Sequence, residues 1–329
     1  MVTTLKDVAE KAGVSVKTVS RVVNNQGEIS AETREHVAAV LDELGYRPNA
    51  LARGLVSGKS ATVALIIPQI TDPFFPEVML GVDSVARAHG YNVFLCNTED
   101  DPARELEYID ILAGKRVDGI ILCGSRLNAV QLAEVAKQHR VSILSSRNPP
   151  SSAVIRIPGE AGLFATTRHL TERGHARIGH IGLRAPDEHD RLEGYERALK
   201  EAGLPLDAKW VRWIPRVNIE AAYTAAKSLL TEAPEITAVS CYNDLAAIGT
   251  MRAAAELGRR IPDDLSITGF DDISMASLVS PPLTTIRVLR YQLGERVMQL
   301  LLKVIASDGK LEQREQVDIE LIVRRSSGG

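Results

Sequence analysis

The sequence predicts a small helical N-terminal unit followed by a two-lobed α/β body with parallel sheets. Residues 5–44 divide into three short segments whose apolar residues have helical spacing. From residue 62 onward, short apolar runs alternate with helix-length segments, which is typical of parallel sheets covered by helices on both faces. The chain has 329 residues, which is too long for one small core.

The first two predicted helices are joined by a tight turn. Leu5, Val8 and Ala9 recur at i, i+3, i+4, the spacing of one buried helical stripe. Gly13 is a C-terminal stop for the first helix, and Ser15 can cap the second through its hydroxyl. The spacing therefore predicts two helices with a short turn between them.

The second of these helices has an apolar side and a polar, partly basic side. Three valines at helical spacing must face inward, namely Val19, Val22 and Val23. The residues left on the opposite side are Val16, Lys17, Ser20 and Arg21. Such a helix fits the major groove of DNA, which admits a helix and presents distinct base edges. The pattern predicts a helix-turn-helix, with an ordinary helical hairpin as the alternative.

A third helix is expected over residues 31–44, ended by Gly45. The three helices together make an all-α headpiece over residues 1–45. Residues 46–60 are expected to be a linker, in which 49–56 can form only a two-turn helix. A helix this short is unstable on its own in water.

The body is expected over residues 61–329. The predicted strands span residues 63–67, 92–96, 119–122, 141–144, 178–181, 238–241 and 265–268. The predicted helices span residues 76–89, 102–115, 129–139, 161–173, 191–202, 219–230, 245–257 and 292–305. Two sheets imply two lobes, and ligands bind such sheets in the crevice at the carboxyl ends of the strands.

Composition and charge narrow the class of protein. The hydrophobic content of 45% with 25% charged residues is that of a soluble globular protein, expected in the cytoplasm. No apolar run approaches the roughly 20 residues of a membrane span, and the N-terminus lacks an apolar signal core. The three cysteines are far apart and are expected to be buried, reduced thiols. The net charge of −3 argues against nonspecific coating of nucleic acid.

Several kinds of catalytic or metal site have no support in the sequence. Residues 54–60 look like a phosphate-binding loop, but they are one residue short of the spacing and no apolar strand precedes them. A Gly-x-Ser-x-Gly elbow and a His-Glu-x-x-His pattern are both missing. The sequence therefore predicts no enzyme, no metal site and no cofactor.

Long ordered motifs resemble the lactose-repressor/galactose-repressor (LacI/GalR) family of bacterial transcriptional regulators. The matching segments are residues 12–15, 18–24, 30–34, 43–55, 281–286 and 321–324, and the resemblance covers nearly the whole chain. It implies a periplasmic-binding-protein-like body whose chain crosses three times between the lobes. It also implies a homodimer that binds palindromic operator DNA as a regulator of carbohydrate genes, most simply a repressor.

For DNA, the resemblance places Val16, Lys17 and Arg21 against the bases. An arginine can make the bidentate contact to guanine, whereas a solvated surface cation is the alternative for Lys17. The polar residues suited to phosphate contacts are Ser15, Thr18, Ser20 and Asn24. The resemblance makes the linker segment a hinge helix with Leu55 as a wedge in the minor groove, and the hinge residues assigned to DNA are Asn49, Ala52 and Leu55. A plain linker is the alternative.

For a small-molecule effector, polar and aromatic groups follow the strands where a cleft should lie. Arginine and carboxylate groups can bind vicinal hydroxyls by charge-assisted hydrogen bonds, and one of the two phenylalanines after the first strand could instead be core. The candidate effector-binding residues, several at the family's effector-contact positions, are Asp72, Phe74, Phe75, Ser125, Arg147, Arg191, Trp213, Asn243 and Asp271. Asp272 is expected to be a turn or cap residue.

Departures from the family pattern bear on the effector. Ser146-Arg147, Pro158-Gly159 and Pro215-Arg216-Val217 stand where many relatives carry acidic or polar cleft residues. Cleft carboxylates are therefore expected to be lost while arginines remain. This favours a sugar acid or phosphosugar over a neutral sugar as the effector.

The predicted mechanism is a dimeric switch in which the effector changes the angle between the lobes and so the stability of the hinge helices. Induction and corepression are both compatible with the sequence. A solute-binding protein and a sugar-modifying enzyme are alternatives, but the first has no use for residues 1–60 and the second lacks a nucleophile. No apolar heptad tail specifies a tetramer.

Overall fold

A computed structural model describes residues 3–24, 27–46, 59–145, 149–151, 153–184 and 190–328. The chain divides into two compact units, Met1–Ser60 and Ala61–Gly329. The predicted hinge helix, with Asn49, Ala52 and Leu55, lies outside the described residues, and so does Arg147.

The N-terminal unit, called the headpiece below, contains α1 (Leu5–Ala12), α2 (Val16–Val23) and α3 (Ala31–Glu43). Thr4 and Asp7 form a capping box at the start of α1, and Gly13 ends it in the left-handed conformation with φ 64°. The core is small and consists mainly of valine and alanine: Val8, Ala9, Ala12, Val19, Val37 and Val40. The predicted helix-turn-helix is therefore confirmed.

The first lobe of the body contains a six-stranded sheet with the order β11-β5-β4-β3-β1-β2. Every neighbouring pair in it is parallel. The strands are β1 (Thr62–Ile67), β2 (Asn92–Asn97), β3 (Gly119–Cys123), β4 (Val141–Ser145), β5 (Ala153–Arg156) and β11 (Gln313–Gln316).

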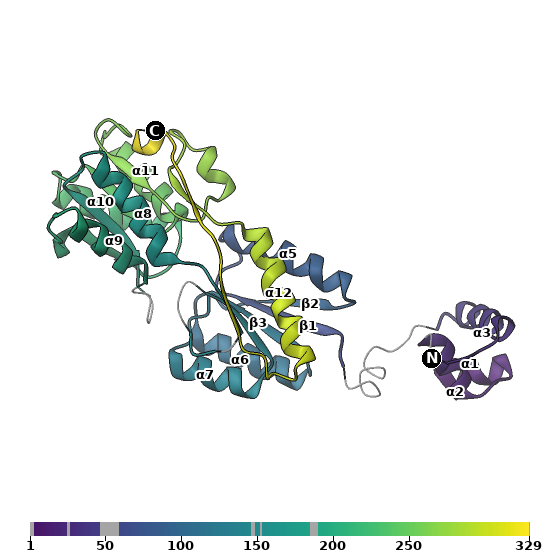
Figure 1. Ribbon diagram of the computed structural model, residues 1–329. Helices are drawn as coiled ribbons and strands as arrows, with labels where there is room; N and C mark the ends of the chain where they lie inside the picture. The colour runs from purple at the N-terminus through teal and green to yellow at the C-terminus, as the bar shows by residue number, and fades with distance from the viewer. Residues whose placement is uncertain are drawn as a thin grey trace. The chain divides into compact units, whose positions relative to one another are not determined.

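Helices cover both faces of this sheet (Figure 1). The first-lobe helices are α5 (Phe74–Ala88), α6 (Pro102–Gly114), α7 (Ala129–Gln138) and α12 (Arg290–Ala306). Successive residues of β1 point to opposite faces: Leu65 packs with α5 and α12, whereas Ala64 and Ile66 pack with α6 and α7. This double burial explains why the strands read as unbroken apolar runs.

The second lobe has a four-stranded parallel sheet with the order β7-β6-β8-β9. Its strands are β6 (Ile178–Leu183), β7 (Val211–Ile214), β8 (Ala238–Cys241) and β9 (Ser266–Thr268). Its helices are α8 (Gly159–Glu172), α9 (Asp190–Glu201), α10 (Ile219–Glu232) and α11 (Asp244–Glu256). Short 3₁₀ turns lie at Ala208–Trp210, Ser274–Ser277 and Arg325–Ser327.

The chain passes between the lobes three times, as predicted. It leaves the first lobe between β5 and α8 and returns between β10 (Thr285–Arg287) and α12. It leaves again between β11 and β12 (Glu320–Ile322), and β10 pairs with β12 as a separate antiparallel ribbon. Figure 1 shows the last segment running from the first lobe to the second.

The predicted strands and helices of the body are all present, but five strands were missed. β11 is an edge strand with the sequence Gln-Arg-Glu-Gln and no buried residue, so no apolar run marks it. β7 is likewise an edge strand, and β5, β10 and β12 have only three or four residues each. Strands this short or this polar resemble loops in sequence.

Two predictions from composition can also be compared with the structure. Cys96, Cys123 and Cys241 are all buried and free, as expected. Among the described helices, none is long and apolar enough to cross a membrane.

Candidate functional sites

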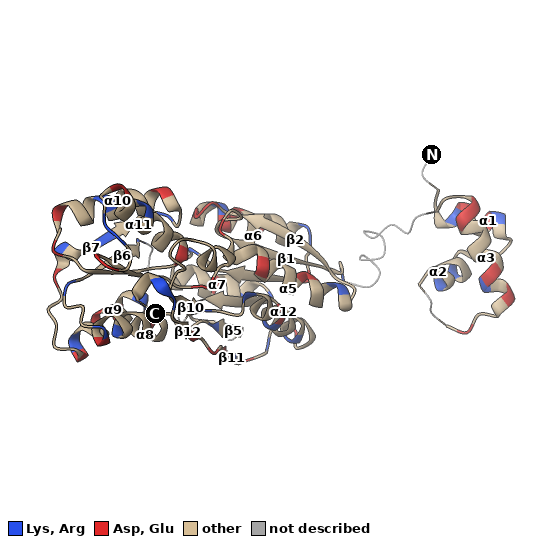
Figure 2. Ribbon diagram, turned by 90° about the horizontal axis from the view of Figure 1, so that it is seen from above, with Lys and Arg blue, Asp and Glu red and all other residues tan. Residues whose placement is uncertain are grey.

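The outward face of α2 is the first candidate site. Val19 is fully buried, whereas Val16 is 45% exposed and Lys17 and Arg21 are also exposed. This confirms the side assignment made from helical spacing. Figure 2 shows only basic charged residues on α2, while α1 and α3 carry charges of both signs. The face therefore offers two cations and a small apolar group to a partner.

Polar residues at both ends of α2 hold the helix in place. The Ser15 hydroxyl accepts a hydrogen bond from the Thr18 amide at 3.1 Å, and the two hydroxyls lie 2.9 Å apart. At the other end, the Asn24 amide group donates to the Ser20 carbonyl at 2.8 Å and lies 3.3 Å from its hydroxyl. Of the four candidates for phosphate contacts, Ser15 and Asn24 therefore also cap the helix that presents Lys17, and Thr18 and Ser20 are their partners.

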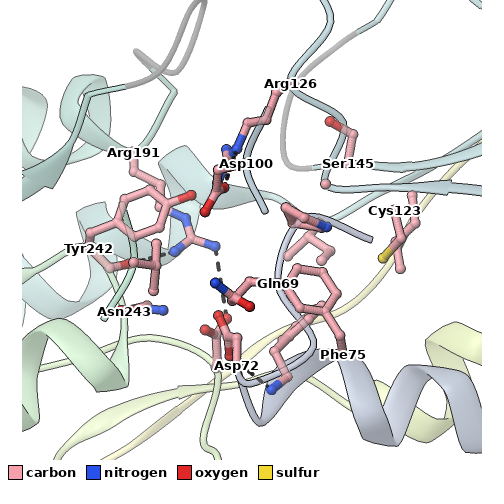
Figure 3. Close-up of a pocket in the computed structure, with 17 residues that line it drawn as sticks. Gln69, Asp72, Phe75, Asp100, Cys123, Arg126, Ser145, Arg191, Tyr242 and Asn243 are labelled. Atoms are coloured by element: carbon pink, nitrogen blue, oxygen red, sulfur yellow. Dashed lines mark hydrogen bonds and ion pairs between the residues drawn. The ribbon is translucent and has the colours of Figure 1, made fainter. Parts of the chain in front are cut away.

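A pocket in the body is the second candidate site (Figure 3). It lies at the carboxyl ends of the strands, where ligands of parallel sheets bind. First-lobe residues reach it from the loops after β1, β2 and β3, from the end of β4 and from the residue after β5. Second-lobe residues reach it from the start of α9 and the loops after β7, β8 and β9. The predicted residues that line it are Asp72, Phe74, Phe75, Arg191, Asn243 and Asp271.

Arg191 is the best-held cation in this pocket. Its Nη1 donates to the Tyr242 carbonyl oxygen at 2.5 Å, and its Nη2 lies 3.9 Å from an Asp271 carboxylate oxygen. Its guanidinium also lies over the rings of Tyr242 and Phe270, 4.2 and 4.0 Å from their centroids. Figure 3 shows the guanidinium beside Tyr242, directed toward the side of the pocket that carries Asp72.

Two buried carboxyl groups reach the pocket from opposite lobes. Burial raises the pKa of Asp72, and its hydrogen bond from the Phe74 amide at 3.0 Å opposes that rise. Burial also raises the pKa of Asp271 to about 7; Arg191 lowers it and the negative charge of Asp72 raises it. The two acids therefore affect each other across the pocket with Arg191 as their shared cation.

Asn243 lines the pocket and also caps a helix. Its side-chain oxygen accepts a hydrogen bond from the Ala246 amide at 3.0 Å and so caps α11. The side chain also lowers the pKa of Asp271 by hydrogen bonding. Asn243 therefore sets both the start of α11 and the environment of the second-lobe acid.

An ion pair on the first-lobe side of the pocket was not predicted from the sequence. Asp100 accepts from the Arg126 Nε at 2.8 Å, and their side chains are only 16% and 11% exposed. Both residues line the pocket, as do Gln69 and Tyr242. Asp100 follows β2 and Arg126 follows β3. Both strands were predicted, so the position of these residues just after a strand was the sequence signal that could have identified them.

Two predicted effector residues do not line this pocket. The Ser125 hydroxyl accepts a hydrogen bond from the Leu127 amide at 3.2 Å, within its own loop. Trp213 lies on the edge strand β7 and packs against Gly182, where an added Cβ would be 2.9 Å from the Trp213 ring. Arg216 is exposed, and its neighbour Val217 takes the place in the pocket.

Among the described residues, the pocket has more carboxyl groups than arginines. Asp72, Asp100 and Asp271 line the pocket, against two arginines, Arg126 and Arg191. The carboxyl groups come from loops other than those compared with the family pattern. In the part of the chain that the structure describes, no three His, Cys, Asp or Glu side chains cluster as metal ligands do.

Family models match almost the entire chain. The model described as "Bacterial regulatory proteins, lacI family" matches residues 4–49. The model described as "Periplasmic binding proteins and sugar binding domain of LacI family" matches residues 60–325.

Individual relatives match over the full length. The HTH-type transcriptional repressor PurR of Vibrio vulnificus (strain CMCP6) is 36% identical, with 98% of this chain and 97% of the relative covered. The HTH-type transcriptional repressor CytR of Escherichia coli (strain K12) is 35% identical, with 98% and 96% covered.

Solved structures match both the headpiece and the body. The lac repressor dimer bound to operator and the anti-inducer ONPF has a TM-score of 0.89 and 27% identity, with 99% of each chain covered. A complex of the transcriptional regulator CelR with cellobiose has a TM-score of 0.74 and 29% identity, with 98% of this chain and 99% of that chain covered.

Proposed function

The chain belongs to the LacI family of bacterial regulatory proteins and is a DNA-binding transcriptional repressor of that family, and we propose that it controls carbohydrate genes in response to a sugar-like effector. The observation that carries the effector proposal is the pocket in which Arg191, Asp72 and Asp271 converge from two lobes. Paired arginine and carboxylate groups bind neighbouring hydroxyls, and aromatic rings pack on the apolar face of a sugar.

A neutral sugar is the first candidate for the effector. Arg126 is paired with Asp100, and Arg191 is held by the Tyr242 carbonyl and lies near Asp271. An anionic ligand would have to compete with these groups for the two guanidinium ions, whereas hydroxyls can use the remaining acceptors. This reverses the preference for a sugar acid or phosphosugar that the sequence alone suggested. The cellobiose complex of the similar regulator CelR supports a sugar.

We also propose that the chain acts as a homodimer. The similar lac repressor is a dimer on its operator. On β2, the outermost strand of the first-lobe sheet, Phe94 and Leu95 are 46% and 40% exposed, and Leu80 on the neighbouring α5 is 60% exposed. Large exposed apolar side chains along the open edge of a sheet are typical of a subunit interface.

On DNA, the proposed readers are Val16, Lys17 and Arg21 of α2, with Ser15, Thr18, Ser20 and Asn24 toward the phosphates. Their exposure on one helix face supports this assignment. Asn49, Ala52 and Leu55 stay proposed hinge residues, and Leu55 predicts a palindrome with a central C-G step. The headpiece over 1–45, the linker over 46–60 and the body over 61–329 are the proposed functional divisions.

The proposed control is a change in the angle between the lobes that alters how well two headpieces fit one operator. In this scheme the effector can either weaken DNA binding, as an inducer, or strengthen it, as a corepressor. The binding experiment below distinguishes the two. We place the protein in the cytoplasm, where its operator would be. The relatives are repressors by name, which supports a regulatory and not an enzymatic role.

The test is binding of the purified chain to DNA from upstream of its own gene, with and without a panel of sugars. The panel pairs neutral sugars, cellobiose and ribose among them, with their acid and phosphate derivatives. We expect nanomolar binding to one palindrome that changes at least about tenfold with one neutral sugar. Failure to bind any home-genome fragment at low salt would refute the regulator. Binding of only charged sugars, measured by calorimetry, would refute the neutral effector.

A further inference from the structure

Arg290, the first residue of α12, makes contacts in both lobes. It is only 8% exposed. Its Nε and Nη2 donate to the two carboxylate oxygens of Glu77 at 3.0 and 2.9 Å, a bidentate pair within the first lobe. Its Nη1 donates to the main-chain carbonyls of Asp271 and Asp272 in the second lobe, to the latter at 2.8 Å. One guanidinium therefore links the two lobes.

The two carbonyls that Arg290 binds belong to an unusual turn, called the acid turn below. Asp271 has φ 111° and Asp272 has φ 50°, both positive and neither a glycine. Such a conformation is strained for a residue with a side chain and persists only where the surroundings hold it. The Asp271 amide donates to the Ile286 carbonyl at 2.8 Å, and the Asp272 carboxylate binds Arg324 at 2.7 Å. The other Asp272 carboxylate oxygen accepts from the Arg287 Nε at 2.8 Å, and Arg290 binds both main-chain carbonyls of the turn.

The acid turn carries a residue of one pocket wall, and Glu77 lies on the helix that carries residues of the opposite wall. Asp271 lines the pocket from the second lobe. Glu77 lies in the first turn of α5, whose first residues, Phe74 and Phe75, line the pocket from the first lobe. Arg290, bound to Glu77 on one side and to the acid turn on the other, therefore connects the elements that carry the two pocket walls.

The first-lobe end of this link is rigid. α5 and α12 cross so closely that a Cβ added at Gly294 would lie 2.0 Å from the Val78 carbonyl oxygen. A Cβ at Gly81 would be equally close to the Tyr291 carbonyl oxygen. Because the two helices are in backbone contact, Arg290 cannot move without moving α5 or breaking its pair with Glu77.

We infer that Arg290, through Glu77 on α5 and the carbonyls of the acid turn, is a positioning residue that sets the angle between the two pocket walls. The effector does not need to touch it. A ligand that moves Asp271 changes the contacts of Arg290, and the change is passed to α5 in the first lobe. This deepens the proposed function, because it takes the pocket as the effector site, but the link itself is a property of the body.

The angle between the lobes can be measured without knowing the effector. Spin labels are attached to the full chain at Val130→Cys on α7 and Thr231→Cys on α10, both exposed positions in different lobes. The native cysteines are buried, and the chain without added cysteines measures any labelling of them. Excess unlabelled chain removes distances between subunits. Pulsed electron paramagnetic resonance then gives the distribution of interlobe distances.

The variants are Arg290→Met, Arg290→Lys and Glu77→Gln in this labelled background. The matched control is Arg252→Met, which removes an exposed arginine that pairs with Glu220 within the second lobe. We expect the width of the distance distribution to about double in Arg290→Met and Glu77→Gln, because the walls lose their link. Arg290→Lys should lie between these and the parent chain, since lysine keeps the charge without the fork. Arg252→Met should match the parent.

Unchanged distributions in Arg290→Met and Glu77→Gln would overturn the inference, even if their melting temperatures fell, since a merely structural role predicts that result. Equal broadening in Arg252→Met would overturn it as well. If Arg290→Met does not fold, Glu77→Gln decides alone. DNA plays no part in this measurement, so a chain that ignores operator DNA would refute the proposed function and leave this test intact.

Discussion

The two candidate sites differ in how their side chains are held. On α2 of the headpiece, Lys17 and Arg21 project into solvent from a helix whose one fully buried residue is Val19. In the pocket of the body, Arg191 and Asp271 are 8% and 4% exposed and are bound by other protein groups before any ligand arrives. Changes on α2 should therefore alter recognition without unfolding the protein, whereas changes in the pocket should alter binding and stability together.

Removal of Arg191 should produce the largest effect. Arg191→Met leaves the Asp271 carboxylate without its nearest cation, and breaking a buried pair on one side costs about 3–5 kcal/mol. Urea unfolding at pH 8, where Asp271 is charged, measures the loss, and sugar binding should disappear with it. Arg252→Met, an exposed arginine in the same lobe, is the control. Equal stability of the two variants would show that the pocket is not pre-assembled as described.

The raised pKa of Asp271 should make stability depend on pH. The folded chain keeps this proton up to about pH 7, whereas the unfolded chain releases it near pH 3.8. The stabilising contribution is therefore complete below pH 3.8 and is lost as the pH rises to about 7, at no more than about 1.4 kcal/mol per pH unit. Asp271→Asn should remove this dependence, measured by urea unfolding between pH 5 and 8.

A second carboxyl group provides the control for this titration. Hydrogen bonds from Arg260 lower the pKa of Asp264 to about 2, so its contribution is present above pH 3.8 and is lost as the pH falls. Asp264→Asn should therefore differ from the parent chain by a constant amount between pH 5 and 8. A slope in that variant equal to the one assigned to Asp271 would contradict the assignment.

Loss of Arg21 should change sequence preference and leave stability alone. Arg21→Ala removes a potential bidentate contact to guanine, worth about 1–3 kcal/mol at one base pair. Binding to matched and mismatched operators measures this, and the melting temperature should equal that of the parent because Arg21 is exposed. Lys6→Ala, an exposed lysine on α1, controls for general loss of charge. An unchanged preference rules out Arg21 as a base-reading residue.

The smallest effect is expected for an exposed ion pair of the headpiece. Lys11 and Glu43 are 2.6 Å apart, but their side chains are 42% and 62% exposed. Glu43→Gln should lower headpiece stability by less than about 1 kcal/mol, and the difference should vanish in high salt. A loss as large as that of Arg191→Met would mean that the headpiece depends on buried electrostatics as the pocket does.

Local spacing was enough to predict the helices of the headpiece and their outward faces, because both depend on residues within one or two helical turns. Helix periodicity places Val8 and Val19 inside and Lys17 outside without knowledge of the rest of the chain. The Gly13 stop and the Ser15 cap also act within one turn of the helices that they bound. The family resemblance then added what such an outward face is for.

Only part of the pocket could be predicted, because its residues come from loops that are far apart in the chain. Asp72 and Arg191 stand next to clear strand and helix boundaries, so their place in a crevice could be anticipated. Asp100 and Arg126 were missed because nothing in either local sequence shows that the loops after β2 and β3 meet. Trp213 does not line the pocket, and the strand that carries it, β7, was not predicted.

The sequence by itself determined the order of helices and strands, the two kinds of unit and the outward face of α2, since each depends on periodicity or capping within a few residues. Only the tertiary structure decided which charges meet. Glu77 and Arg290 are 213 residues apart, and their pairing requires α5 and α12 to cross at two glycines. Two charged side chains interact strongly only when they are close in space. Folding brings them together through apolar packing, which does not depend on their charge.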